Sequence, residues 1–72
     1  MNKKWILLTS AELGVQDWQV ENTWKLVGDG ATIPFISRYR KEMTGNLDEV
    51  YVSKLNEKFN FVNETLKFVQ IK

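Results

Sequence analysis

The sequence contains neither cysteine nor histidine in its 72 residues. Without cysteine the chain can form no disulfide, zinc ribbon or iron–sulfur cluster, and it offers no thiol nucleophile. Without histidine it has no imidazole metal ligand and no Ser-His-Asp triad. A chain of this length also buries only about 60% of its unfolded surface, which leaves little structure to enclose an active site. The sequence therefore predicts a protein that is not an enzyme, with no metal and no cofactor.

An excess of charge of one sign is also missing, because ten Lys and Arg residues balance nine Asp and Glu residues to a net charge of +1. A histone-like grip on DNA and a polybasic membrane anchor both need a larger positive surplus. Long apolar runs are absent as well. The run Trp5-Ile6-Leu7-Leu8 ends at Thr9, well short of the roughly 7–15 residues of a signal-peptide core and the roughly 20 of a membrane span. We expect a cytoplasmic protein with no membrane partner.

Glycine and proline are scarce, and their positions divide the chain. Hydrophobic residues make up 43% and charged residues 26%, which is typical of a folded globular protein. Gly14, the turn at residues 28–30 and the pair Gly45-Asn46 separate four segments. No repeat or linker interrupts them, so we expect one helical domain over residues 1–72.

The first two segments predict two short helices. Residues 3–13 favour a helix that ends at Gly14, although the apolar run within them is also typical of a strand. Residues 17–27 place Val20, Trp24 and Val27 on one helical face.

The third segment predicts a helix over residues 33–43. Thr32 is a good N-cap, and Pro34 is tolerated in the first turn because its missing N–H would be unpaired there. One side of this helix carries Ile36, Tyr39, Arg40 and Met43, with Phe35 beside them.

The fourth segment, from Asp48 to the C-terminus, carries two apolar lines. A seam with alternating steps of three and four residues is formed by Val52, Leu55, Phe59, Val62, Leu66 and Val69. A second line on roughly the opposite face is formed by Val50, Phe61 and Phe68. The second line indicates either a docking surface, for another copy or another domain, or aromatic residues that merely decorate the surface. The expected fold is all-α, a small bundle of three short helices and one long C-terminal helix.

Candidate chemistry is sparse. Asp48 and Glu49 are adjacent, so on a helix they point in different directions and cannot form an acid–base pair; Asp48 is more simply a helix cap. The loop at residues 28–32 lacks the spacing of a phosphate-binding P-loop and is better explained as a turn between helices.

Arg38-Tyr39-Arg40-Lys41 is the one dense basic cluster. If Arg38 and Lys41 share a helix face, they can contact phosphates while Tyr39 stacks on a base. In the structural alternative Tyr39 lies in the core, Arg40 pairs with a carboxylate and the other two are solvated. Residue chemistry alone favours the structural alternative.

The run GATIPFISRYRKEMTGNLDEV at residues 30–50 closely resembles the N-terminal segment of the Tex family of bacterial transcription accessory proteins. The segments Ala11-Glu12-Leu13-Gly14 and Gln19-Val20-Glu21 match the two preceding helices of that family, and the resemblance covers about residues 9–70. The chain departs from the family at Gln16-Asp17, where a Ser or Thr cap is usual, at Gly28, and in its three tryptophans.

Tex proteins are much longer, carry a ribonuclease-H-like domain, helix-hairpin-helix elements and an RNA-binding domain, and bind nucleic acid. The resemblance implies that this chain is their helical N-terminal region, either a fragment or a short relative. Three hypotheses follow. The chain docks against the remaining domains of a Tex-like protein, with nucleic acid bound by the whole protein. Alternatively, it binds DNA or RNA itself through Arg38, Arg40 and Lys41. In the third hypothesis it forms a homo-oligomer through Val50, Phe61 and Phe68.

Overall fold

The computed structural model describes the backbone of residues 3–70 and the side chains of residues 3–65. The described chain is helical without strands and consists of α1 (Lys3–Leu13), α2 (Asp17–Gly28), α3 (Ile33–Tyr39), α4 (Lys41–Thr44) and α5 (Glu49–Gln70). The predicted all-α fold with a long C-terminal helix is therefore confirmed. Among these helices none combines the length and the apolar character that crossing a bilayer requires.

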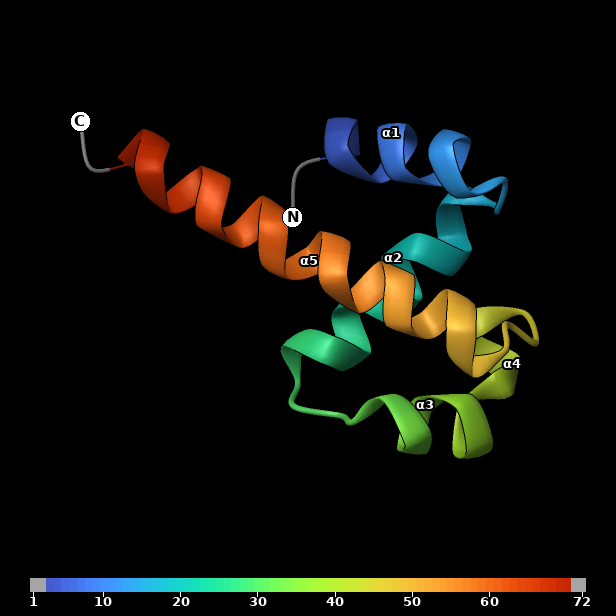
Figure 1. The fold of residues 1–72 in the computed structure, drawn as a ribbon. Helices are drawn as coiled ribbons and strands as arrows, with labels where there is room; N and C mark the ends of the chain where they lie inside the picture. The colour runs from blue at the N-terminus through green and yellow to red at the C-terminus, as the bar shows by residue number, and fades with distance from the viewer. Residues whose placement is uncertain (1–2, 71–72) are drawn as a thin grey trace.

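Helix α2 is the centre of the bundle, because it packs against each of the other four helices. Figure 1 shows α2 running behind α5, with α1 on one side and α3 on the other, while the C-terminal half of α5 projects beyond them. The core lies where these helices meet and consists of Ile6, Val20, Trp24, Leu26, Ile36, Leu47, Val52, Leu55 and Val62. Removing these apolar side chains from water is the main driving force for the fold.

The predicted apolar seam of α5 is the face that enters this core. Val52, Leu55 and Val62 are fully buried, and Phe59 packs against the core while remaining partly exposed. Leu66 and Val69, which continue the pattern, lie outside the described side chains. The predicted face of α2 is equally buried at Val20 and Trp24.

Hydrogen bonds between polar groups stabilise the turn between α1 and α2, and the sequence did not predict these pairs. Gly14 adopts a left-handed backbone conformation with φ of 71°, and the Ser10 hydroxyl donates to Asp17 Oδ1 at 2.6 Å. In place of the Ser or Thr cap usual in the family, the Gln16 N–H donates to Gln19 Oε1 at 2.8 Å. The start of α2 is thus stabilised by Gln19, three residues into the helix.

The predicted cap of the third helix is confirmed. The Phe35 N–H donates to Thr32 Oγ1 at 3.4 Å, and Pro34 occupies the first turn. The turn before it closes α2, because the Ala31 N–H donates to the Leu26 carbonyl at 3.0 Å while Gly30 takes a φ of 93°. The loop at residues 28–32 therefore ends one helix and begins the next.

The prediction of one continuous helix over residues 33–43 is wrong at Arg40. Arg40 has φ of −127° and ψ of 34°, so α3 ends at Tyr39 and α4 begins at Lys41. The break redirects α4 onto α2 and leaves Thr44 fully buried.

Two amide side chains of α2 account for this redirection. Asn22 Nδ2 donates to the Met43 carbonyl and Gln19 Nε2 donates to the Thr44 carbonyl, each at 2.9 Å. These carbonyls belong to the last turn of α4, where backbone carbonyls have no N–H donor within the helix. The hydrogen bonds therefore dock the end of α4 against α2, which a straight helix from Ile33 cannot achieve.

Gly28 gives a first testable prediction. Its backbone is helical, and a Cβ atom there would lie 3.7 Å from Phe59 Cζ, an ordinary van der Waals contact. Since glycine loses more chain entropy than alanine in a helix, Gly28→Ala is expected to raise the free energy of unfolding by about 0.5 kcal/mol. In a domain of this size that corresponds to a rise in Tm of about 2–4 °C, measured by circular dichroism.

Gly30 provides the matched control for this change. It lies two residues away, but its φ of 93° is unfavourable for alanine. Gly30→Ala is therefore expected to lower the free energy of unfolding by about 1–2 kcal/mol. A loss of stability on Gly28→Ala would contradict the prediction.

Candidate interaction surfaces

The acidic residues considered at the sequence level have structural contacts. Asp48 is confirmed as a helix cap, because its Oδ1 accepts the Tyr51 N–H at 3.1 Å at the start of α5. Asp17 accepts the Ser10 hydroxyl. Within the part of the chain that the structure describes, no group of three or more acidic side chains could hold a metal ion.

The structure places the basic cluster differently from the prediction that Arg38 and Lys41 share a helix face. Because the helix breaks at Arg40, Arg38 lies in α3 and Lys41 in α4, so the two do not share a face of one helix. Both side chains are exposed, and Arg40 is half-buried. Arg38, Arg40 and Lys41 are therefore close together in the chain, but they do not lie along a single helical face.

Two features of the structural alternative for this cluster are wrong. Tyr39 does not enter the core, since 61% of its surface is exposed. Arg40 does not pair with a carboxylate among the described side chains: its guanidinium lies 5.1 Å from the centroid of the Phe35 ring, and its Nη1 donates to the Tyr39 carbonyl at 3.1 Å. Tyr39 shares the exposed side of α3 with Phe35, four residues earlier, whereas Ile36 occupies the buried side, and Arg40 lies over Phe35 at the point where the helix breaks.

The second apolar line of α5 is solvent-exposed where its side chains are described. Val50 is 60% exposed and Phe61 is 57% exposed. Phe61 also contacts α1, because its ring meets Trp5 edge to face at a centroid distance of 6.4 Å. Phe68, the third residue of this line, lies outside the described side chains.

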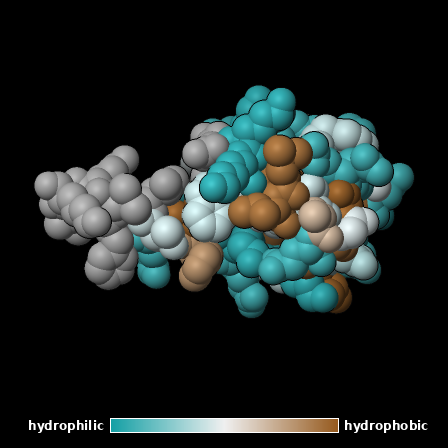
Figure 2. Space-filling model, turned by 90° about the horizontal axis from the view of Figure 1, so that it is seen from above, coloured by the Kyte–Doolittle hydropathy of each residue, from teal (hydrophilic) through white to brown (hydrophobic). Residues whose placement is uncertain are grey.

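Helix α1 adds further exposed apolar side chains, which the sequence analysis did not predict. Leu7 and Leu8 are 46% and 54% exposed. Figure 2 shows an apolar patch surrounded by hydrophilic atoms on the face of the molecule that carries α1. The run Trp5-Ile6-Leu7-Leu8 was the available signal, since only Ile6 of these four is fully buried and a single amphipathic face cannot bury all of them.

Two shallow hollows lie on either side of an ion pair that joins α1 to α5. Lys58 Nζ is 2.8 Å from Glu12 Oε1. One hollow of about 230 Å³ contains Trp5 and Leu8 in its wall, and the other, of about 340 Å³, contains Leu13 and Phe61. The groove between α1 and α5 is therefore an uneven surface in which recesses lined by both apolar and charged side chains flank the ion pair.

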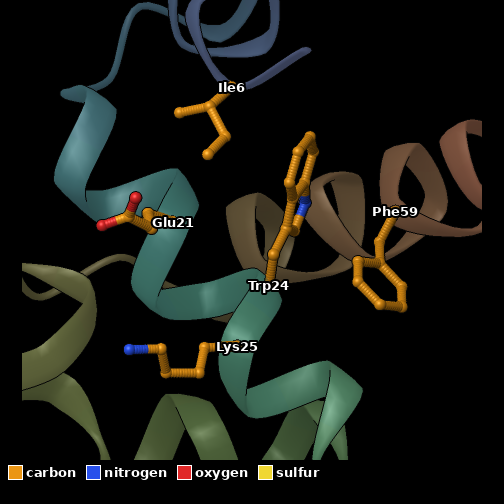
Figure 3. Close-up of a pocket in the computed structure, with 5 residues that line it drawn as sticks. All are labelled: Ile6, Glu21, Trp24, Lys25 and Phe59. Carbon is orange, nitrogen blue, oxygen red and sulfur yellow. The ribbon is translucent and has the colours of Figure 1, made fainter. Parts of the chain in front are cut away.

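A larger hollow of about 510 Å³ opens between α1, α2 and α5. Figure 3 shows its lining: Ile6 from α1, Trp24 with Glu21 and Lys25 from α2, and Phe59 from α5. Ile6 and Trp24 are 5% and 2% exposed, so they form its floor, whereas Glu21 and Lys25 are exposed. Its lining offers apolar contact and two opposite charges.

Comparison with known proteins identifies the family. The family described as Tex-like protein N-terminal domain matches residues 3–67. The chain is 42% identical over 57 residues to the transcriptional accessory protein Tex of Neisseria gonorrhoeae, covering 79% of this chain and 8% of that protein. It is 42% identical over 55 residues to protein tex of Bordetella pertussis, covering 76% of this chain and 7% of that protein.

The similarity extends to a human protein. The chain is 42% identical over 48 residues to S1 RNA-binding domain-containing protein 1 of Homo sapiens, covering 67% of this chain and 5% of that protein. No solved structure gives a significant match. The chain spans only 7–8% of the length of the bacterial relatives described above. Because the family match covers nearly the whole described chain and includes the run at residues 30–50, the chain belongs to the Tex-like protein N-terminal domain family.

Proposed function

We propose that this chain is a non-catalytic helical docking module of a cytoplasmic Tex-like transcription accessory protein. Its partners are the remaining domains of that protein, and nucleic acid is bound at the level of the whole assembly. The observation that carries the proposal is the exposed apolar line of α5, in a chain whose bacterial relatives described above are more than ten times as long as the matched region.

The geometry of α5 supports a two-sided role. Val50 and Phe61 are eleven residues apart, which is close to three helical turns, so they lie on one line along the helix. Both are more than half exposed, while Val52, Leu55 and Val62 on the other side are fully buried. A helix that is apolar on two faces is typical of one that packs against structure on both sides.

The α1–α5 groove adds anchoring points next to this line. Leu8 and Phe61 are more than half exposed and lie at the recesses on either side of the Lys58–Glu12 ion pair. Aromatic side chains such as Phe61 are enriched in the cores of protein interfaces, where a few residues supply most of the affinity, and the surrounding rim is polar. A helix of the partner laid across the groove would cover both.

The test uses the remaining domains of the N. gonorrhoeae relative, expressed without their own matched segment. Isothermal titration calorimetry should detect binding of the 72-residue chain to this protein. Val50→Glu combined with Phe61→Glu is expected to weaken it at least tenfold, because about 1.4 kcal/mol or more of apolar contact is replaced by buried charge. Asn60→Glu, an exposed position next to Phe61 but about 100° around the helix, is the matched control and should bind like the parent chain.

Each outcome decides between the hypotheses. Absence of binding by the parent chain, or equal binding by the double variant, would contradict docking through α5. If sedimentation instead shows a dimer of the parent chain that dissociates in the double variant, self-association through this line replaces the docking proposal. Circular dichroism should show both variants folded, since Val50 and Phe61 are more than half exposed and Asn60 is also exposed.

A further inference from the structure

Helix α3 presents two aromatic rings to solvent at the side of the molecule away from α1. Phe35 is 39% exposed and Tyr39 is 61% exposed. They are four residues apart, so they lie one above the other on the same helix face. Their ring centroids are 5.4 Å apart with the planes inclined at 48°. The two rings form a continuous aromatic surface, called here the α3 platform, that the core does not use.

Arg40 holds one side of the platform in place. Its guanidinium lies over the Phe35 ring at 5.1 Å from the centroid, and its Nη1 donates to the Tyr39 carbonyl at 3.1 Å. Stacking of this kind fixes the orientation of both the cation and the ring. The Tyr39 ring, which is the more exposed of the two, is left available to another planar group.

The segment that carries the platform is basic. Residues 30–41 contain Arg38, Arg40 and Lys41 and no acidic residue, while Asp29 and Glu42 border the segment at its two ends. Arg38 is three residues after Phe35 and therefore borders the platform on the same helix. Arg38 and Lys41 are exposed, and neither forms an ion pair with a described side chain. The local excess of positive charge on this segment favours an anionic partner.

We propose that the α3 platform binds single-stranded nucleic acid, with one base stacked on Tyr39 and the backbone phosphates contacted by Arg38 and Lys41. Exposed aromatic rings beside cations suit this ligand, because every base offers a flat face and every nucleotide a negative charge. Binding of a duplex is disfavoured, since the bases of a duplex are already stacked and a protein needs a more extended basic surface to bind its backbone. A hollow of about 480 Å³ beside Phe35 and Arg40 is also lined by Thr32 and Asp29, so it gives a base, and not a phosphate, a recess next to the platform.

This proposal is independent of the docking function proposed above, because it concerns α3 and not the α5 line. Its failure leaves the calorimetric test with the remaining domains unaffected, because the variants that test docking through α5 lie outside the platform.

The first test is the salt dependence of binding. Fluorescence anisotropy with a fluorescein-labelled twelve-nucleotide oligouridylate should show weak binding at low salt. With two phosphate contacts, from Arg38 and Lys41, log K is expected to fall against log salt with a slope of about −1.4. Arg38→Ala should reduce the slope to about −0.7, because one of the two phosphate contacts is lost.

The second test separates stacking from charge. Tyr39→Ala is expected to weaken binding by about fivefold or more at constant salt, whereas Tyr39→Phe should retain most of the affinity. Tyr51→Ala is the matched control: Tyr51 is 38% exposed on α5 with Lys54 Nζ 5.7 Å from its ring centroid, so it offers the same chemistry elsewhere. The control should bind the oligonucleotide like the parent chain.

Three results would overturn the proposal. They are absence of binding at low salt, equal losses in the Tyr39→Ala and Tyr51→Ala variants, and a duplex of the same length binding as tightly as the single strand. If Tyr39→Ala leaves the oligonucleotide affinity unchanged but weakens binding to the remaining domains of the N. gonorrhoeae relative, the platform is a protein-docking surface instead.

Discussion

Trp24→Ala is expected to lower the free energy of unfolding by about 3–5 kcal/mol, which is typical of the loss of a large buried aromatic side chain. Trp24 is 2% exposed at the centre of the bundle, and its ring lies 6.2 Å from that of Phe59. Its Nε1 donates to the carbonyl of Leu55 at 2.9 Å in a fully buried hydrogen bond. The substitution therefore removes both core packing and a direct link from α2 to α5.

The size of this effect matters because the whole domain is small. A chain of 72 residues has a total free energy of unfolding of only about 4–11 kcal/mol at the usual 0.05–0.15 kcal/mol per residue. Urea unfolding followed by circular dichroism should show a variant that is either largely unfolded in the absence of urea or only marginally stable. Trp24→Phe keeps most of the packing but loses the hydrogen bond, so we expect an intermediate loss of about 1–2 kcal/mol.

Trp18 is the matched control, since it is the same residue type in the same helix. It is 48% exposed, so Trp18→Ala should cost about 1 kcal/mol or less. Equal losses for the two alanine variants would show that Trp24 does not hold the bundle together in the way described.

Gly45→Ala is expected to lower the free energy of unfolding by about 2–3 kcal/mol, the second largest effect. Gly45 has a φ of 67°, in the left-handed region, where a side chain costs about 1–2 kcal/mol. A Cβ atom there would also lie 2.7 Å from Trp18 Cη2 and would collide with the side-chain amide of Gln19. Gln19 would have to move, and its hydrogen bond to the Thr44 carbonyl, worth about 1 kcal/mol, would be lost.

Gly14→Ala separates backbone strain from collision. Gly14 has nearly the same φ, 71°, but a Cβ atom there meets nothing within 4 Å. Its substitution should cost only the strain of about 1–2 kcal/mol. Urea unfolding of both variants therefore measures the contribution of the contact between α2 and the end of α4. If Gly45→Ala is no more destabilising than Gly14→Ala, the close approach of Gln19 and Trp18 is not a constraint on the fold.

The sequence by itself determined the helical class, most helix boundaries and the family. These follow from local signals: the period of apolar residues in α2 and α5, the Thr32 cap, and glycines at the turns. Each depends on residues within one or two helical turns of each other, so it can be read along the chain. The run at residues 30–50 identified the family in the same way, because its residues are contiguous in the sequence.

The tertiary structure alone decided the break at Arg40 and, with it, the candidate nucleic-acid surface. The hydrogen bonds from Asn22 and Gln19 to the end of α4 span 21 and 25 residues, and no periodicity within residues 33–43 contains them. These bonds hold α4 on α2, and at the break Arg40 lies on Phe35 instead of pairing with a described carboxylate, while the packing of Ile36 in the core leaves Tyr39 on the solvent side of α3. Local pattern specifies helices, whereas contacts between distant segments specify where a helix must stop and which side chains remain exposed.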